Sequence, residues 1–125
     1  MSGRVAALSR ARAQTETQIT RAILEYLAVC RILAWRVNSR VVRMPGKGGL
    51  DRLVRFGGRP GMPDIAGVLP GGRALFLEVK RAGGVTSREQ VLMLNRLTEA
   101  GALALIVYGV NDVRAVLRDL GLDAR

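Results

Sequence analysis

The sequence predicts an α/β fold, a mixed β-sheet flanked by helices, because strand-like and helix-like segments alternate along its second half. Residues 73–80 form a short apolar run between glycine turns at 70–72 and 83–84, which is typical of a buried strand. A helical segment and a second apolar run at 102–108 follow this strand. The order strand, helix, strand implies a right-handed crossover within one sheet.

The chain begins with a predicted basic arm and a predicted helix. Residues 1–13 carry arginines and no acidic residue, so we expect a basic N-terminal arm before a single domain at 14–125. From Thr15 to about Arg31, apolar residues recur at intervals of three and four, which is typical of an amphipathic helix. The acidic residue in its first turn, Glu16, favours the helix dipole.

Residues 33–37 and about 52–56 are predicted strands on either side of a glycine-rich loop at 44–49. This loop is not a phosphate-binding P-loop, because the Gly-x-x-x-x-Gly-Lys-Ser/Thr spacing is absent.

Helices are expected after each of the two later strands. Ser87 can cap a helix that continues to about Glu99, and Gln90 lies early enough in it to reach back toward the end of the strand at 73–80. The last helix is expected to start at Asn111 or Asp112.

The composition favours a polyanionic partner. With 125 residues the chain is long enough for one domain with a modest core. It has 20 Lys and Arg residues against 10 acidic residues, a formal net charge of +10. No apolar run approaches the roughly 18 residues of a membrane-spanning helix, and the start does not resemble a signal peptide, so we expect no membrane partner.

Absent residue types narrow the chemistry. The single Cys30 excludes an intrachain disulfide and suits a reducing cytoplasm, where we expect the protein. Without any histidine, the chain cannot build a His-metal nuclease site, a Ser-His-Asp triad or a histidine-containing zinc site. Metal chemistry with oxygen ligands is what remains for an enzyme.

Two carboxylates and an ammonium group interrupt apolar sequence in the middle of the chain. Asp64 follows Pro63 and precedes an apolar run, and Glu78 and Lys80 end a predicted strand. Because an isolated charge is costly to bury, each of these groups needs a compensating partner or a metal. Glu78 and Lys80 share one face of the strand and Val79 points to the other, which leaves the Val79 carbonyl near the carboxylates.

A divalent metal is the interpretation that we favour. A hard cation such as Mg²⁺ accepts carboxylate, backbone carbonyl and water oxygens together. Lys80 beside it would orient or polarise a water, or stabilise the charge that develops on a phosphoryl group. In the alternative interpretation, Asp64 caps a turn after proline, and Glu78 and Lys80 extend to solvent from a strand end.

Five short motifs follow, in order, the pattern of the VRR-NUC nucleases, a compact branch of the PD-(D/E)xK nuclease superfamily. They are Thr15-Glu16-Thr17-Gln18-Ile19, Arg36-Val37-Asn38-Ser39, Gly61-Met62-Pro63-Asp64, Glu78-Val79-Lys80 and Ser87-Arg88-Glu89-Gln90. The sequence resembles this family from about Glu16 to about Val113. The resemblance implies a restriction-endonuclease-like fold.

The resemblance also implies roles for individual residues. Asp64, Glu78 and the carbonyl of Val79 would ligate Mg²⁺ or Mn²⁺, and Lys80 would be the catalytic lysine. The remaining matches are Glu16, the acidic metal or water ligand on the first helix, and Gln90, the glutamine on the helix after the catalytic strand.

The segment between the first helix and Asp64 is glycine-rich and strongly basic, with one acidic residue, Asp51. A run of charge is usually a solvated face, but its place beside the catalytic turn favours contacts with sugar and phosphate. The candidate DNA-binding residues are Arg36, Arg40, Arg43, Lys47, Arg52, Arg55 and Arg59.

Together these features predict a metal-dependent DNA endonuclease that hydrolyses phosphodiester bonds and, by the resemblance, leaves a 5'-phosphate. A chain this short has no room for a separate sequence-reading domain, which favours recognition of DNA structure through the backbone. Free-standing members of the family resemble Holliday-junction resolvases in size and are expected to form homodimers, which match the symmetry of a four-way junction. We therefore expect a resolvase of branched DNA, acting in DNA recombination and repair.

Three alternatives stay open. The enzyme could be a flap nuclease or a general structure-specific nuclease. A non-catalytic basic DNA-binding module would keep its carboxylates only as structural ion-pair partners. An accessory subunit of a larger machine would assemble through apolar surface such as Leu50, Leu53 and Val54.

Overall fold

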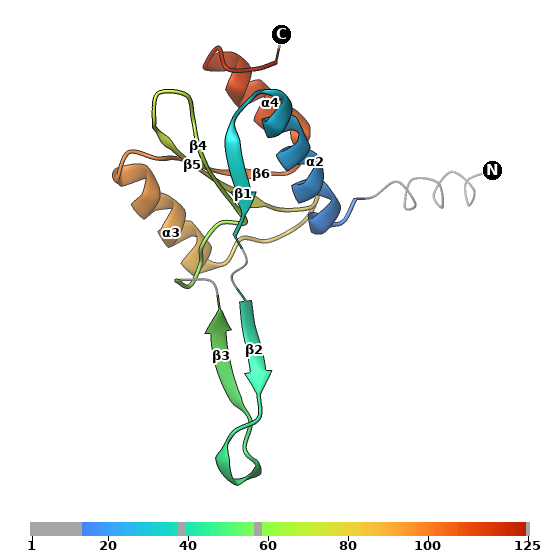
Figure 1. The fold of residues 1–125 in the computed structure, drawn as a ribbon, viewed down its shortest axis with the longest axis vertical. Coiled ribbons are helices and arrows are strands. Elements are labelled where there is room, and N and C mark those ends of the chain that lie inside the picture. The colour runs from blue at the N-terminus through green and yellow to red at the C-terminus, as the bar shows by residue number, and fades with distance from the viewer. Residues whose placement is uncertain (1–13, 38–39, 57–58, 125) are drawn as a thin grey trace, which may run out of the picture.

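The computed structural model describes residues 14–37, 40–56 and 59–124 (Figure 1). The predicted basic arm at 1–13 lies outside the described residues. In chain order the elements are α2 (Glu16–Val29), β1 (Leu33–Arg36), β2 (Arg40–Met44), the 3₁₀ turn η1 (Lys47–Gly49), β3 (Arg52–Phe56), β4 (Ile65–Val68), β5 (Ala74–Val79), α3 (Arg88–Glu99), β6 (Leu103–Val107) and α4 (Val110–Asp119).

Four strands form one mixed sheet in the order β1-β4-β5-β6. β1 and β5 each pair antiparallel with β4, whereas β6 pairs parallel with β5. The parallel pair is joined through α3, as the crossover in the sequence predicted. The predicted α/β fold with a mixed sheet and flanking helices is confirmed, and it is consistent with a restriction-endonuclease-like domain.

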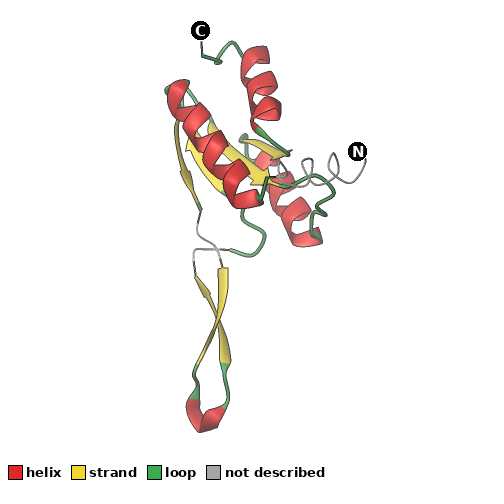
Figure 2. Cartoon of the chain, turned by 90° about the vertical axis from the view of Figure 1, so that its right-hand side faces the viewer, coloured by secondary structure: helices red, strands yellow, loops and turns green. Residues whose placement is uncertain are grey.

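Helices cover the two faces of the sheet unequally. α2 and α4 pack together on one face, over the main core (Figures 1 and 2). α3 covers β5 and β6 on the other face and leaves β1 and β4 open there. Because side chains alternate along a strand, Leu75, Leu77 and Val79 of β5 face the main core, and Glu78 faces the side of α3. The core residues are Ile19, Ile23, Leu27, Ile32, Ile65, Leu69, Leu75, Leu77, Val79, Val107, Val113 and Leu117.

The strand predicted at 33–37 pairs with β4, a strand that the sequence did not predict. Gly67 in β4 lowers its strand propensity. A side chain at Gly67 would come within 2.6 Å of the carbonyl oxygen of Leu33, so the glycine is what lets β1 approach β4. Gly67 thus makes β4 hard to predict from the sequence, and the pairing of β4 with β1 requires it.

The strand predicted at 52–56 exists, but it does not join the main sheet. β3 pairs antiparallel with β2, a strand at residues 40–44 that the sequence did not predict, and the two form a separate hairpin. Arg40 and Arg43 interrupt the apolar pattern of β2, so its sequence does not predict a strand. We call residues 40–56 the β-arm. It extends away from the four-stranded sheet, and within the described chain its strands pack chiefly against each other (Figures 1 and 2).

The helix boundaries lie close to those predicted. Thr15 and Ser87 cap α2 and α3, each through a reciprocal capping box with a glutamine three residues later. α4 begins at Val110, slightly before the expected start, and Asp112 accepts a 2.7 Å hydrogen bond from the N–H of Tyr108. No helix in the described part of the chain is long and apolar enough to cross a membrane.

Candidate active site

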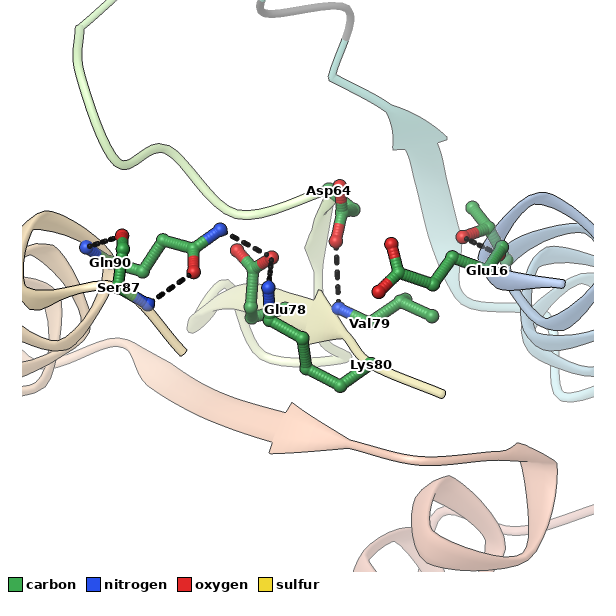
Figure 3. Close-up of polar contacts among 8 residues, drawn as sticks. Glu16, Asp64, Glu78, Val79, Lys80, Ser87 and Gln90 are labelled. Atoms are coloured by element: carbon green, nitrogen blue, oxygen red, sulfur yellow. Dashed lines mark hydrogen bonds and ion pairs between the residues drawn. The ribbon is translucent and has the colours of Figure 1, made fainter. Parts of the chain in front are cut away.

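The register of β4 and β5 brings the two predicted carboxylates together. Ile65 pairs with Leu77, so one step further along this antiparallel pair Asp64 stands beside Glu78 (Figure 3). Both side chains therefore leave the same face of the sheet, and Lys80, two residues after Glu78, follows on that face. The site is thus built at the point where the pairing of two strands ends.

Asp64 is held on both sides by backbone. Its Oδ2 atom accepts a 2.8 Å hydrogen bond from the N–H of Val79, and its own carbonyl accepts a 2.7 Å bond from the N–H of Val37. The preceding loop packs against the start of α3 at Gly61, where φ is +79° and an added Cβ would lie 2.5 Å from the carbonyl oxygen of Glu89. A side chain at this position would push Asp64 and α3 apart.

Glu78 is buried, with 2% of its surface exposed. Its Oε1 atom accepts a 3.0 Å hydrogen bond from Nε2 of Gln90 and lies 3.8 Å from Nζ of Lys80 (Figure 3). Its Oε2 atom is buried and has no hydrogen-bond partner among the described residues. A carboxylate oxygen in this state costs free energy unless another group compensates it.

The environment makes Glu78 hard to ionise. Burial, and after it the neighbouring Asp64, raise the pKa of Glu78 from an ordinary value of 4.5 to about 8. Lys80 opposes this effect, and Glu16 adds a smaller contribution in the same direction as Asp64. A cation at the site would favour the charged form instead, because it would attract both carboxylates.

Gln90 connects the start of α3 to Glu78. Its Oε1 atom accepts a 2.9 Å hydrogen bond from the N–H of Ser87, and its N–H donates to Oγ of Ser87 at 3.2 Å. Because the amide oxygen is engaged in the helix cap, the amide nitrogen is directed at Glu78. The cap of a helix therefore also orients a buried carboxylate.

Glu16 approaches the site from the first residue of α2. It lines a cavity of about 150 Å³ together with Asp64 and Arg36, and Figure 3 shows its carboxylate directed toward Asp64 and Val79. Within the described residues, no group of three acidic or cysteine side chains lies close enough to hold a metal ion. Glu16 is therefore brought to the edge of the site, not into a three-carboxylate cluster.

Two residues that the sequence analysis did not select also lie here. Thr17 lines the cavity with Asp64, and Thr17 and Arg81 line a second one of about 210 Å³ beside Glu16. Arg81 could have been suspected, because it is a cation directly after the Glu-Val-Lys strand. Thr17 offered no such signal, since a threonine in the first turn of a helix is common.

The residues present fit a hard divalent cation. Asp64 and Glu78 lie side by side, and the unpartnered Oε2 atom of Glu78 is the kind of buried acceptor that a cation satisfies. The chain has only oxygen donors to offer here, which suits Mg²⁺ or Mn²⁺. Val79 follows Glu78 in the chain and is hydrogen-bonded to Asp64 through its N–H. Its carbonyl would supply a third oxygen, and water would complete the ligands.

The predicted DNA-binding residues do not form one surface. Arg36 lines the cavity beside Asp64. Arg59 lies near α3, in a shallow pocket with Leu92 and Arg96. The others belong to the β-arm: Arg43, Lys47 and Arg52 have described, exposed side chains, and Arg40 and Arg55 lie on its strands, with side chains outside the described part.

Comparison with known proteins identifies one family. The model of the VRR-NUC domain matches residues 9–111, which is most of the chain and includes every candidate catalytic residue. No curated protein and no solved structure matches the chain.

In the metal-free protein, replacing Glu78 by glutamine should change the pH dependence of stability. The folded-state pKa of Glu78, near 8, is raised above its ordinary value, so its contribution to stability is full below about pH 4.5 and is lost as the pH rises through 8. Glutamine imitates the neutral form at every pH. The melting temperature of Glu78→Gln should therefore rise relative to that of the parent protein between about pH 5 and about pH 9, measured with chelator. A difference that does not vary with pH would contradict this assignment.

Proposed function

The chain belongs to the VRR-NUC family, a family of nuclease domains that act on DNA, and we propose that it is a divalent-metal-dependent, structure-specific DNA endonuclease. One observation carries this proposal. The buried Glu78 has one oxygen, beside Asp64, for which the described residues supply no hydrogen-bond partner. Its other oxygen accepts a hydrogen bond from Gln90 and lies near Lys80. Such a pair is expensive to maintain for structure alone and is suited to a cation.

Asp64, Glu78 and the carbonyl of Val79 would hold Mg²⁺ or Mn²⁺. When bound, the cation supplies a more acidic water and neutralises charge on the phosphoryl group. Lys80 presents its ammonium group on the same face as both carboxylates, where it can donate a hydrogen bond to a water or to a phosphate oxygen. Gln90 keeps Glu78 in place throughout, and Glu16 at the edge of the site can accept a proton or orient a water.

We propose further that the substrate is branched DNA and that the protein is most specifically a Holliday-junction resolvase. All described elements belong to the nuclease fold or to the β-arm, so no described segment forms a separate domain that reads sequence. Basic side chains lie at the site, beside α3 and along the β-arm. Contacts from such side chains to phosphates recognise the path of the DNA backbone. A flap or another branched structure is the second candidate substrate.

A homodimer would supply the two sites that paired cuts require. Where α3 leaves the sheet uncovered, Leu33, Trp35 and Val68 have 68%, 49% and 39% of their surface exposed. Leu33 and Val68 are directly paired, and Trp35 is two residues from Leu33, so the three share one face. A contiguous apolar patch on a small domain is typical of an interface, and a two-fold dimer presents the same patch from both copies.

The function is tested by cleavage of a labelled four-way junction, a flap, a linear duplex and a single strand with Mg²⁺, with Mn²⁺ or with chelator. We expect metal-dependent, paired cuts in the junction. Asp64→Asn and Lys80→Met should each lower the cleavage rate by about a hundredfold or more while DNA binding changes little, because the phosphate contacts lie elsewhere.

Asp119→Asn, at the end of α4, is the matched control for these variants and should cut normally. Cuts mainly in the flap would keep the nuclease and change its substrate. Tight binding that chelator does not affect, without any cutting, would leave only a DNA-binding module.

The start of α3 has two roles, to cap the helix and to hold Glu78 in place, and Gln90→Leu and Ser87→Ala should separate them. Gln90→Leu removes the amide that donates a hydrogen bond to Glu78, so it should lower metal affinity and activity by about 10–100-fold, as for other residues that orient a metal ligand. Ser87→Ala removes a helix cap, at a cost of about 1 kcal/mol, but keeps the backbone N–H that holds Gln90. Its activity should stay near that of the parent protein. Equal activity losses in both variants would mean that Gln90 acts only through the cap.

Trp35→Ser should weaken the proposed dimer. Removal of a large aromatic anchor from an interface core commonly lowers affinity by about tenfold or more. Sedimentation equilibrium should show more monomer for this variant than for Val29→Ser, which removes a more exposed apolar residue from α2. A parent protein that is monomeric throughout would refute the dimer.

A further inference from the structure

The β-arm is the part of the molecule that the catalytic chemistry does not use. Among the described residues its strands pair only with each other, and it projects from the nuclease body (Figure 2). Its five-residue strands span roughly 16 Å. An isolated hairpin is marginally stable in water, so a projecting one without a partner needs a function.

The surface of the β-arm combines cations with exposed apolar side chains. Arg43, Lys47 and Arg52 are exposed, and the one nearby acid, Asp51, is 4.0 Å from Arg43. Leu50 and Leu53 are 75% and 70% exposed.

The pairing register spreads this mixture over both faces of the hairpin. Arg43 stands opposite Leu53, and Met44 stands opposite Arg52. Directly paired residues lie on the same face, so at this end of the hairpin a cation stands beside an apolar side chain on each face. A surface of this kind suits a partner whose charge and apolar area alternate at short range.

The tip holds Leu50 in a defined position. Gly48 and Gly49 have φ angles of +71° and +75°, which allow the chain to reverse. A side chain at Gly46 would collide with the carbonyl of Leu50, so the two ends of the turn are in close contact. Leu50 is therefore displayed by a compact turn.

We propose, on the basis of the nuclease function proposed above, that the β-arm recognises the branch point of the DNA. Arg43, Lys47 and Arg52 contact phosphates, and Leu50 and Leu53 pack against the base-pair face that is exposed where duplex arms diverge. A two-stranded ribbon fits the major groove of DNA, and leucines act as wedges against unstacked bases in other DNA-binding proteins. A continuous duplex hides its base-pair faces, so the leucines gain contacts only at a branch.

Two separate functions follow for the arm. Its cations strengthen binding to any DNA, because every duplex offers phosphates. Its leucines give preference for branched over linear DNA. Because the strands of the arm pack chiefly against each other within the described residues, we expect neither group to be needed for folding of the site or for chemistry.

The test is equilibrium binding of the full chain to a labelled four-way junction and to a linear duplex of matched sequence, with chelator so that nothing is cut. Leu50→Ser/Leu53→Ser should lower affinity for the junction by about tenfold and for the duplex by less than about twofold. Lys47→Ala/Arg52→Ala should lower both affinities alike and flatten their salt dependence. Val29→Ser, which removes an exposed apolar residue from the body, should leave both affinities unchanged.

A 2-aminopurine base at the branch gives a direct readout. Its fluorescence should change on binding of the parent protein and change much less with Leu50→Ser/Leu53→Ser. An unchanged melting temperature would show that this variant folds normally.

The inference is overturned if the parent protein does not prefer the junction, or if the leucine variant keeps the full preference and fluorescence change. Either result would leave the leucines free for a protein partner. Because these readouts need no cleavage, a parent protein that prefers junctions but never cuts would refute the nuclease proposal and not this one.

Discussion

The structure depends on the placement of two carboxylates side by side at the end of the β4–β5 pairing. One strand register sets Asp64 next to Glu78, and the second carboxylate is buried. Like charges in a buried site oppose folding, and the groups around them offset this cost. The N–H of Val79, the amide of Gln90 and the ammonium of Lys80 each direct a hydrogen or a positive charge toward one of the two carboxylates. One oxygen of Glu78 has no hydrogen-bond partner in the part of the chain that the structure describes, and this is where we expect a cation to bind.

The surrounding fold can be understood as support for this pair. α3 packs on the same face of the sheet as Glu78 and delivers Gln90 from its first turn, while α2 and α4 bury the opposite face. Gly61 lets the loop before Asp64 contact α3 closely, so the two strands and the helix fix one another. The β-arm lies outside this support. The site and the proposed recognition element can therefore change independently, which is a common way for one fold to serve different substrates.

Patterns that depend on neighbours in the chain were predictable. The helix at 16–29 follows from its apolar spacing, and the strand at 74–79 follows from its apolar run between glycine turns. Strands β2 and β4 were not predicted. β2 is held by its hairpin partner, and β4 contains the glycine that its neighbour requires. Both are strands because of pairing with residues distant in the sequence, and a propensity scale does not contain that information.

The amino-acid sequence alone was enough to identify the chemical groups and the family. An acid after proline, the Glu-Val-Lys strand end and the ordered motifs around them are local features, and the family match covers the same region. How these groups meet depends on the folded arrangement of the chain. In the folded chain Glu78 is buried, and its Oε2 atom has no hydrogen-bond partner among the described residues. Gln90 donates to the other oxygen of Glu78, and Glu16 lies at the edge of the site. The predicted DNA-binding residues also lie in three different places: Arg36 lines the cavity at the site, Arg59 lies beside α3, and the others belong to the projecting β-arm. The physical reason is that burial and strand register arise from contacts between distant segments, whereas charge and local periodicity are properties of the chain alone.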